Sequence, residues 1–464
     1  MASDFPVFGS LPSPSLFTFP PGANPAFIPP PAPNTAPSAP PFLIPDHIYQ
    51  AALDPKVPIT IAALYAITAK ALNKYNTSTG KKPWPISKTR PFFAFVVLHN
   101  VFLAVYSAWT FVGMFGTLRR SMVNPLGPDG LAGFVDSACK LNGPGGLGQA
   151  ADYDENSGAW TSLSSVVSLG ADGLPSRNDM GRIWNEGLAF YGWIFYLSKF
   201  YEVLDTFIIL AKGKLSSTLQ TYHHAGAMMC MWAGMRYMSA PIWMFVFVNS
   251  GIHAMMYTYY TLTAFNIRVP ILVKRTLTSL QITQFLVGAS YAMAHSFVSY
   301  TVPVVVSVNQ ASTGSAATTD AAPSGGLLDG LKGLVFGAGA VGHPTAGGSS
   351  SDAHSITTTY GQRVLPCITT TGQTFAIWLN VLYLAPLTYL FVSFFIASYL
   401  KRASAESKRA RSGKGSAKAR RPSSHLHVAE EAGWDAATGI RREVYGETET
   451  VVAVANGKKT VSRH

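Results

Sequence analysis

The chain has 464 residues, of which 48% are hydrophobic and only 12% are charged. Soluble domains carry roughly 25% charged residues, so this composition excludes an ordinary soluble globule and favours a membrane protein. The formal net charge of +12 would suggest nucleic-acid binding if it were spread over a domain. Instead, nine Lys and Arg and a single acid fall between Lys401 and Arg421, so the excess is concentrated in one tail.

The first 45 residues contain 14 of the 31 prolines and almost no charge. Proline lacks a backbone N–H and fixes φ, so this composition disfavours helices and central strands. The stretch also lacks the basic region followed by an apolar region that marks a secretory signal. We therefore predict a disordered, proline-rich arm over residues 1–55, followed by a membrane domain over residues 56–400.

Seven apolar segments follow, each of a length that suits a bilayer about 30 Å thick. In chain order they cover residues 57–73, 92–117, 187–209, 216–235, 241–263, 280–306 and 375–400. They predict an all-α integral membrane protein with seven transmembrane helices. Two connections rich in Gly, Ser, Thr and Ala, residues 118–186 and 307–374, interrupt the series, and the second is predicted to be a low-complexity insert. Residues 401–464 are predicted to be a basic, disordered tail.

The distribution of Lys and Arg between the connections predicts the topology, because basic connections remain on the cytosolic side. With the basic tail in the cytosol, that side carries 24 Lys and Arg and the opposite side carries nine. The short connections alone give ten against one on the same assignment. We therefore predict a lumenal N-terminus, a cytosolic C-terminus, and both long connections on the lumenal side.

The three cysteines are distributed over different parts of this topology. Cys139 and Cys367 each lie in one of the two long lumenal connections, whereas Cys230 lies inside an apolar segment. Two cysteines on the oxidising side either pair in a disulfide or remain as two free thiols, and the sequence leaves both alternatives open. Cys230 is predicted to be a small packing residue.

Ionisable side chains inside membrane segments are costly and are therefore candidates for function. In the third segment, Lys199, Glu202, Asp205 and Thr206 share one helical face. The alternative interpretation is an ion-pair cluster that holds helices together.

Polar side chains recur in the next three segments. The fourth contains Gln220, His223 and His224, the fifth contains Asn249, His253, Tyr257 and Tyr260, and the sixth contains Gln281 and Gln284. Gln220 lies one turn before the histidines, where its amide can fix an imidazole tautomer. Since the predicted topology places all these groups near the cytosolic side, we expect them to form one polar layer.

A histidine-rich membrane site raises the question of a metal centre. The membrane segments contain five histidines, which are His99, His223, His224, His253 and His295. This set is too small for a di-iron site built from several histidine boxes, and the acidic cluster lacks the pattern of Glu-x-x-His motifs. We therefore predict no metal and no cofactor, and a site for a single metal ion is the alternative that this argument leaves open. His99 is predicted to make a hydrogen bond in helix packing.

These motifs together resemble the ELO family of fatty acid elongases. The matching residues are Lys199-x-x-Glu202-x-x-Asp205-Thr206, Gln220-x-x-His223-His224, Asn249-x-x-x-His253-x-x-Met256-Tyr257-x-Tyr259-Tyr260 and Thr278-x-x-Gln281-x-x-Gln284-Phe285. The resemblance covers residues 85–305 and the last segment. Gln220 stands where many members have a histidine, a variant that is similar to some elongases acting on polyunsaturated chains.

The resemblance implies an acyltransferase, a very-long-chain 3-oxoacyl-CoA synthase of the endoplasmic reticulum membrane. Such an enzyme condenses a long-chain acyl-CoA with malonyl-CoA, its co-substrate, and releases CO2 and CoA. Six of the seven helices would enclose a tunnel for the acyl chain. The implied partners are these substrates, membrane lipid, and the reductases and dehydratase of microsomal chain elongation, with no nucleic acid.

Residue roles are expected from this chemistry. We expect His223 to take the acyl group as an acyl-imidazole, with Gln220 setting its tautomer, and His224 and His253 to stabilise the enolate. Asp205 and Glu202 would orient imidazoles or Lys199. The expected substrate-binding residues are Lys199, Thr206, Asn249, Tyr257, Tyr260, Gln281, Gln284, Lys212 and Lys214. Among these, the three lysines are candidates for the CoA phosphates or the malonyl carboxylate.

Further alternatives remain open at this point. His223 could act as a general acid or base for direct attack, without a covalent intermediate. The chain could instead be a multi-pass transporter or receptor that binds a ligand in its polar layer without chemistry. The basic tail is either a solvated arm or a segment attracted to anionic lipid.

Overall fold

The computed structural model describes residues 5–22, 25, 27–167, 169–308 and 357–411. The chain divides into two units, of which the first comprises Met1–Val302 with Gln362–His464 and the second Pro303–Gly361. Among the described residues, the first unit holds the helices and the candidate site, and the second contains parts of two strands.

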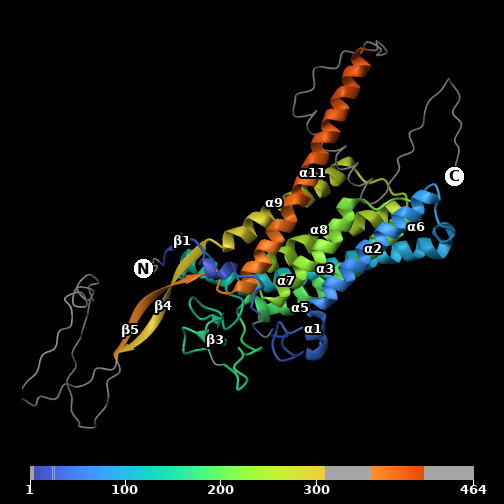
Figure 1. Cartoon of the computed structure of the whole chain (residues 1–464). Coiled ribbons are helices and arrows are strands. Elements are labelled where there is room, and N and C mark those ends of the chain that lie inside the picture. Colours follow the sequence, from blue (N-terminus) through green and yellow to red (C-terminus); the bar gives the residue numbers. More distant parts are fainter. Residues whose placement is uncertain (1–4, 23–24, 26, 168, 309–356, 412–464) are drawn as a thin grey trace, which may run out of the picture. The chain divides into compact units, whose positions relative to one another are not determined.

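Helices form where the apolar segments predict them. The long helical elements are α2 (Lys56–Ser78), α3 (Arg90–Ser121), α5 (Ala189–Tyr201), α6 (Val203–Ala211), α7 (Thr218–Arg236), α8 (Ile242–Ala264), α9 (Ile271–His295) and α11 (Thr371–Arg411). Within the first unit, α3 packs along α8, α2 packs along α7, and α11 packs against both α7 and α9 (Figure 1). Among the described helices, α3 alone is long and apolar enough to cross a membrane.

Local signals in the sequence start these helices. The Thr89 hydroxyl accepts a hydrogen bond from the Phe92 N–H at the start of α3, and the Ser217 hydroxyl accepts one from the Gln220 N–H at the start of α7. Side chains of this kind satisfy N–H groups that have no partner within the helix. Helices α8 and α9 begin directly after Pro241 and Pro270, because proline is favoured at a helix start.

The third apolar segment is not one continuous helix. A π-helical turn, η3 (Trp184–Leu188), precedes α5, and Glu202 separates α5 from α6. The Asp205 N–H donates to the Glu202 carbonyl at 3.1 Å, three residues back, so the chain turns more tightly here than in an α-helix. The break therefore falls inside the motif that runs from Lys199 to Thr206.

The predicted end of the sixth segment is wrong. Helix α9 ends at His295, and residues that we expected to be helical to 306 form strand β4 (Val298–Val308). After Ser296 the sequence becomes rich in valine, whose branched side chain favours a pleated strand over a helix. The length of the segment suited a membrane-spanning helix. The change of composition within the segment, however, coincides with the end of α9.

Small sheets correct the all-α prediction. Strand β1 (Val7–Gly9), β4 and β5 (Thr357–Pro366) form a three-stranded sheet in the order β1-β4-β5, in which Val7 pairs with Tyr300 in antiparallel register. Strands β2 (Ala151–Asp154) and β3 (Ala159–Ser162) form a hairpin. Strand β5 lies inside the predicted low-complexity insert, so residues 357–366 of that insert form regular structure. Residues 309–356 of the insert lie outside the described residues.

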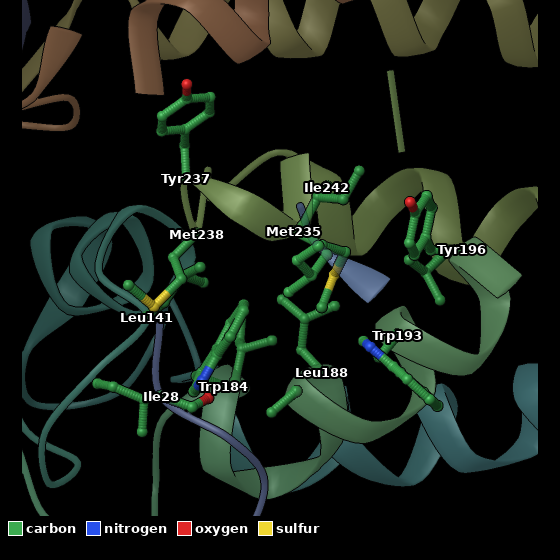
Figure 2. Close-up of a cluster of buried hydrophobic side chains, with 14 of the residues drawn as sticks. Ile28, Leu141, Trp184, Leu188, Trp193, Tyr196, Met235, Tyr237, Met238 and Ile242 are labelled. Carbon is green, nitrogen blue, oxygen red and sulfur yellow. Dashed lines mark hydrogen bonds between the residues drawn. The ribbon is translucent and has the colours of Figure 1, made fainter. Parts of the chain in front are cut away.

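The proline-rich arm is ordered where the structure describes it, which contradicts the prediction of disorder. It contains β1, a short 3-10 helix η1 (Pro14–Phe17) and helix α1 (Asp46–Ala52). Ile28 is 1% exposed, and its carbonyl accepts a hydrogen bond from Trp184 Nε1 at 2.7 Å. Figure 2 shows Ile28 beside Trp184 in a core that also contains Leu188 and Met235. Proline disfavours regular structure, but it does not prevent apolar side chains from burying surface.

A buried polar cluster and a disulfide tie the loops to this core. Helix α4 (Gly130–Cys139) carries Asp136, which forms an ion pair with Arg182 at 2.7 Å and accepts a hydrogen bond from Tyr300. Burial and the neighbouring Asp136 carboxylate raise the pKa of the Tyr300 hydroxyl well above its ordinary value. Cys139 and Cys367 form a disulfide with a Cα–Cα distance of 4.9 Å, so the pairing alternative is confirmed.

The basic tail is partly helical. Helix α11 contains Pro386 and continues to Arg411, so the prediction of disorder is wrong for residues 401–411. Residues 412–464 of the tail lie outside the described residues.

Candidate functional site

An apolar cavity of about 190 Å³ lies between α5, α7, α8, α9 and α11. Its walls are mainly Phe, Met, Val, Ile and Leu side chains. The polar side chains in its lining are Lys199, His223, Asn249, Gln284, Thr283, Asn380 and Tyr383. The first four are among the predicted site residues, so the structure brings one member of each of the four motifs to the same cavity.

His223 contributes the imidazole in the cavity wall. It lies on the second turn of α7 and is half-buried, and its Nδ1 is 2.9 Å from the hydroxyl oxygen of Tyr383 on α11. The same hydroxyl lies 2.9 Å from the His223 carbonyl oxygen. A Cβ at Gly226 would overlap the Tyr383 ring, so the glycine allows this ring to lie directly against α7.

Lys199 is a buried cation at the edge of the cavity. Its Nζ is 2.7 Å from Glu202 Oε1, and the two side chains are 5% and 4% exposed. The same carboxylate oxygen accepts a hydrogen bond from Ser198 and lies 3.6 Å from Nδ1 of His253. Burying a charge is tolerated when a counter-charge and hydrogen bonds compensate for the lost water. Glu202 therefore supports the lysine, as the sequence predicts, and approaches one imidazole.

A chain of hydrogen bonds continues from Lys199 across the cavity wall. Lys199 Nζ donates to Asn249 Oδ1 at 3.3 Å, and Asn249 Nδ2 donates to Gln284 Oε1 at 3.2 Å. The donors all point in one direction, from α5 through α8 to α9. This arrangement fixes both amides and leaves the ammonium group as the charged member of the cavity lining.

Asp205 serves a neighbouring polar cluster. Its carboxylate lies 2.7 Å from His99 Nε2 and accepts a hydrogen bond from the Tyr257 hydroxyl at 2.6 Å. These contacts join α3, α6 and α8, so Asp205 orients an imidazole, as predicted, but the imidazole belongs to His99. The expected packing role of His99 is therefore confirmed.

Other predicted residues lie near the cavity without lining it. His224 is 7% exposed, and its ring centroid is 5.5 Å from that of His223 and 6.0 Å from that of Tyr65. Thr206 shares a hydrogen bond with the Tyr65 hydroxyl. The ring of His253 lies 5.7 Å from that of Tyr257.

The remaining predicted residues are more peripheral. Gln281 donates to the sulfur of Met256, and Tyr260 packs against the cluster formed by Leu103 and Met256. Lys212 is exposed and Lys214 is half-buried in the connection between α6 and α7. Among the described residues, no group of three or more His, Cys, Asp or Glu side chains is arranged to hold a metal ion.

Gln220 does not contact His223 in the way that the predicted role, setting the tautomer of this imidazole, requires. Its Oε1 accepts a hydrogen bond from Ser216 at 3.4 Å, and its buried Nε2 has no partner among the described residues. The Nδ1 atom of His223 is occupied by Tyr383 instead. Helical spacing placed Gln220 one turn from the histidines, but its side chain is directed toward the preceding loop, where Ser216 lies.

Tyr383 and Asn380 are the site residues that sequence reasoning missed. They lie three residues apart on α11 and both line the cavity. Polar side chains at this spacing in an apolar segment form the same kind of stripe that identified the other helices. The signal for these two residues is therefore present in the sequence of the seventh segment.

Comparison with known proteins places these features in a family. The model of the "ELO: GNS1/SUR4 family" matches residues 50–407. Human very long chain fatty acid elongase 3 is 38% identical over 105 residues, which are 23% of this chain and 39% of that protein. Chicken (Gallus gallus) very long chain fatty acid elongase 6 is 43% identical over 100 residues, which are 21% of this chain and 37% of that protein.

A more distant organism supplies a further relative. Fatty acid elongase 2 of Trypanosoma brucei brucei is 30% identical over 128 residues, which are 27% of this chain and 46% of that protein. The chain thus spans less than half the length of each of these three relatives. No solved structure matches the chain. Because the family model covers most of the sequence, including every helix that lines the cavity, the chain belongs to the ELO (GNS1/SUR4) family of membrane proteins.

Proposed function

We propose that this protein is a fatty acid elongase that condenses a long-chain acyl-CoA with malonyl-CoA. The products are a 3-oxoacyl-CoA, CO2 and CoA. The observation that carries the proposal is an apolar cavity with a half-buried imidazole and a buried ammonium group in its wall. Family membership and the names of the relatives, which are fatty acid elongases, support the same reaction.

The first step is acyl transfer to His223. The imidazole nitrogen attacks the thioester carbonyl carbon, a C–N bond forms, the C–S bond breaks, and CoA leaves as the thiolate. The apolar side chains of the cavity hold the acyl chain and exclude water, which protects the reactive acyl-imidazole from hydrolysis. Transfer to an imidazole keeps the acyl group activated after CoA has left.

The second step forms the new carbon–carbon bond. Malonyl-CoA loses CO2, and the resulting enolate attacks the acyl carbonyl, which releases the His223 imidazole. Lys199 holds the malonyl carboxylate before decarboxylation, because its ammonium is the charged donor in the cavity lining. In this proposal His253 and His224 stabilise the enolate oxygen, and Lys212 and Lys214 bind the CoA phosphates.

The proposal includes a membrane arrangement. Seven segments span the membrane of the endoplasmic reticulum, six of them enclose the acyl tunnel, the N-terminus is lumenal and the basic C-terminal tail is cytosolic. The disulfide between Cys139 and Cys367 supports an oxidising environment for the two long connections. The 3-oxo product requires reduction, dehydration and a second reduction, so the partners are two reductases and a dehydratase.

A trapping experiment tests the covalent step. Purified protein is incubated with a long-chain acyl-CoA without malonyl-CoA, and intact-mass measurement followed by peptide mapping locates any bound acyl group. We expect an adduct on the α7 peptide that contains His223, its absence in His223→Ala, and its full retention in His47→Ala, because His47 is exposed on α1. Condensation without any bound acyl group would show direct attack instead, with His223 as an acid or base.

A further inference from the structure

The hydroxyl of Tyr383 touches His223 at two different atoms. The hydroxyl oxygen lies 2.9 Å from Nδ1 of the ring and 2.9 Å from the backbone carbonyl oxygen of the same residue. A phenol has one proton to donate, and its oxygen can also accept a hydrogen bond. A carbonyl oxygen can only accept, so the two contacts together constrain where each proton lies.

Two arrangements are chemically available. If the hydroxyl donates to the carbonyl, its oxygen accepts from a protonated Nδ1, and both short contacts are hydrogen bonds. If the hydroxyl donates to a deprotonated Nδ1, the contact with the carbonyl is not a hydrogen bond. The first arrangement satisfies more polar groups in a poorly solvated site, where unsatisfied groups are costly.

The other ring nitrogen favours the same arrangement. His223 lines the apolar cavity, and its Nε2 has no hydrogen-bond partner among the described residues. A protonated Nε2 would place a donor without a partner at an apolar surface, and unpaired buried donors are rarer in proteins than unpaired acceptors. In the cavity without substrate, an unprotonated Nε2, which carries a lone pair, is therefore less costly than a protonated Nε2.

We propose that Tyr383 is a positioning residue that holds His223 in the tautomer with the proton on Nδ1. This tautomer leaves the lone pair on Nε2, the nitrogen available to attack the thioester. The proposal rests on the acyl transfer proposed above and gives to Tyr383 the role that the sequence suggested for Gln220.

Tyr383 is itself held in place by α7. The hydroxyl of Tyr222 donates to the Tyr383 carbonyl at 3.2 Å, and the two rings lie 5.4 Å apart. The missing side chain at Gly226 leaves space for the Tyr383 ring. Tyr383 is only 9% exposed, so its hydroxyl has little access to competing water. These contacts preorganise the hydroxyl before substrate enters.

The proposed tautomer also balances the acyl-transfer step. Attack by Nε2 forms the N–C bond, and the electron pair of the C–S bond leaves with the CoA thiolate. The ring then carries a positive charge with its proton still on Nδ1. The Tyr383 oxygen accepts a hydrogen bond from that Nδ1–H, and such a bond becomes stronger as the donor becomes charged.

The tautomer can be measured without any turnover. We would record ¹⁵N spectra of the full-length protein with labelled histidine and assign His223 by the resonance pair lost in His223→Asn. We expect the chemical shifts of a protonated Nδ1 and an unprotonated Nε2 in the wild-type protein. A proton on Nε2 would overturn the proposal, whether or not the protein elongates fatty acids.

A pair of phenylalanine variants tests the consequence for catalysis. Tyr383→Phe should slow acyl-adduct formation about tenfold, the effect of one neutral hydrogen bond, with little change in the half-saturating acyl-CoA concentration, and should move part of the His223 population to the other tautomer. Tyr389→Phe is the matched control, because Tyr389 lies on the same helix, α11, and is 71% exposed.

The outcomes separate this inference from the proposed function. Adduct formation at the wild-type rate in Tyr383→Phe, with an unchanged tautomer, would contradict the positioning role. If the wild-type protein forms neither adduct nor product, the proposed function fails, while the ¹⁵N spectrum still tests the tautomer. If Tyr383→Phe does not fold, the wild-type spectrum alone supports or overturns the proposal.

Discussion

Lys199 shows how one residue serves both stability and the proposed chemistry. Its ammonium is paired with Glu202 at 2.7 Å in a site that is almost fully buried. Removing one partner of such a pair leaves an uncompensated charge and typically costs about 3–5 kcal/mol, whereas replacing both partners with apolar residues is often neutral. The pair can therefore be removed in two ways that differ in their effect on stability.

We predict that Glu202→Gln strongly lowers thermal stability in detergent and that Lys199→Met combined with Glu202→Leu recovers most of it. Both variants should lack condensation activity, because neither retains a properly held ammonium group for the malonyl carboxylate. Melting curves and product assays on the same preparations check this. A stable double variant with wild-type activity would show that the pair is only structural.

At the residue scale, the sequence predicted the membership of the site better than its contacts. The scarcity of charge in apolar segments identified Lys199, which lines the cavity, and Glu202, which forms an ion pair with it. The hydrogen-bond partner of His223 Nδ1 is Tyr383, which lies 160 residues away in sequence. Spacing along one helix could not show this contact. Contacts of this kind depend on how α11 packs against α7, and helical periodicity carries no information about that.

Among the helices, the contact between α7 and α11 determines the geometry at His223. A Cβ at Gly226 would collide with the Tyr383 ring, whereas a Cβ at Gly116 on α3 would meet only the flexible end of Arg120. Alanine is intrinsically more favourable than glycine inside a helix by about 1 kcal/mol. Alanine at position 226 therefore causes a steric clash, whereas alanine at position 116 does not. The change in helix propensity is the same for both substitutions.

We predict that Gly226→Ala displaces Tyr383 and slows acyl-adduct formation by about tenfold or more, because the His223 hydrogen bonds are lost. Gly116→Ala should retain the wild-type rate and at least the wild-type stability. Single-turnover measurements with acyl-CoA on both variants test this. Equal rates in the two variants would show that Tyr383 tolerates the shift.

The disulfide links α4 to the chain that follows β5, across 228 residues of sequence. Removing a native disulfide that closes a long loop typically costs about 2–5 kcal/mol. We predict that Cys139→Ser with Cys367→Ser lowers the melting temperature, and that reductant lowers the wild-type value to the same level. Reductant should leave the double variant unchanged. An unchanged melting temperature in the variant would show that the loops are held by other contacts.

The sequence predicted the positions of the helices better than it predicted the strands and the fold of the proline-rich arm. Apolar length located the helices, but it could not reveal that Val298–Val308 pairs with β1 or that Ile28 enters the core beside Trp184. Both involve partners far away in sequence. The proline-rich arm in particular gains its order from tertiary burial and not from local propensity.

For the whole molecule, the distribution of basic residues predicts orientation. The tail from Lys401 to Arg421 carries nine Lys and Arg, which favours the cytosolic side of the membrane. We predict that protease added to sealed microsomes removes a tag at the C-terminus and spares a tag at the N-terminus until detergent is added. Protection of the C-terminal tag with cleavage of the N-terminal tag would show the opposite orientation.

The central claim is that the cavity performs a condensation and does not merely bind a ligand. The most direct measurement supplies purified protein in lipid nanodiscs with a long-chain acyl-CoA and malonyl-CoA labelled in its free carboxyl group. The account predicts labelled CO2 in equal amount to a 3-oxoacyl-CoA two carbons longer than the substrate, and neither product with His223→Ala. Folded protein that binds acyl-CoA but releases no labelled CO2 would contradict it and indicate a transporter or receptor.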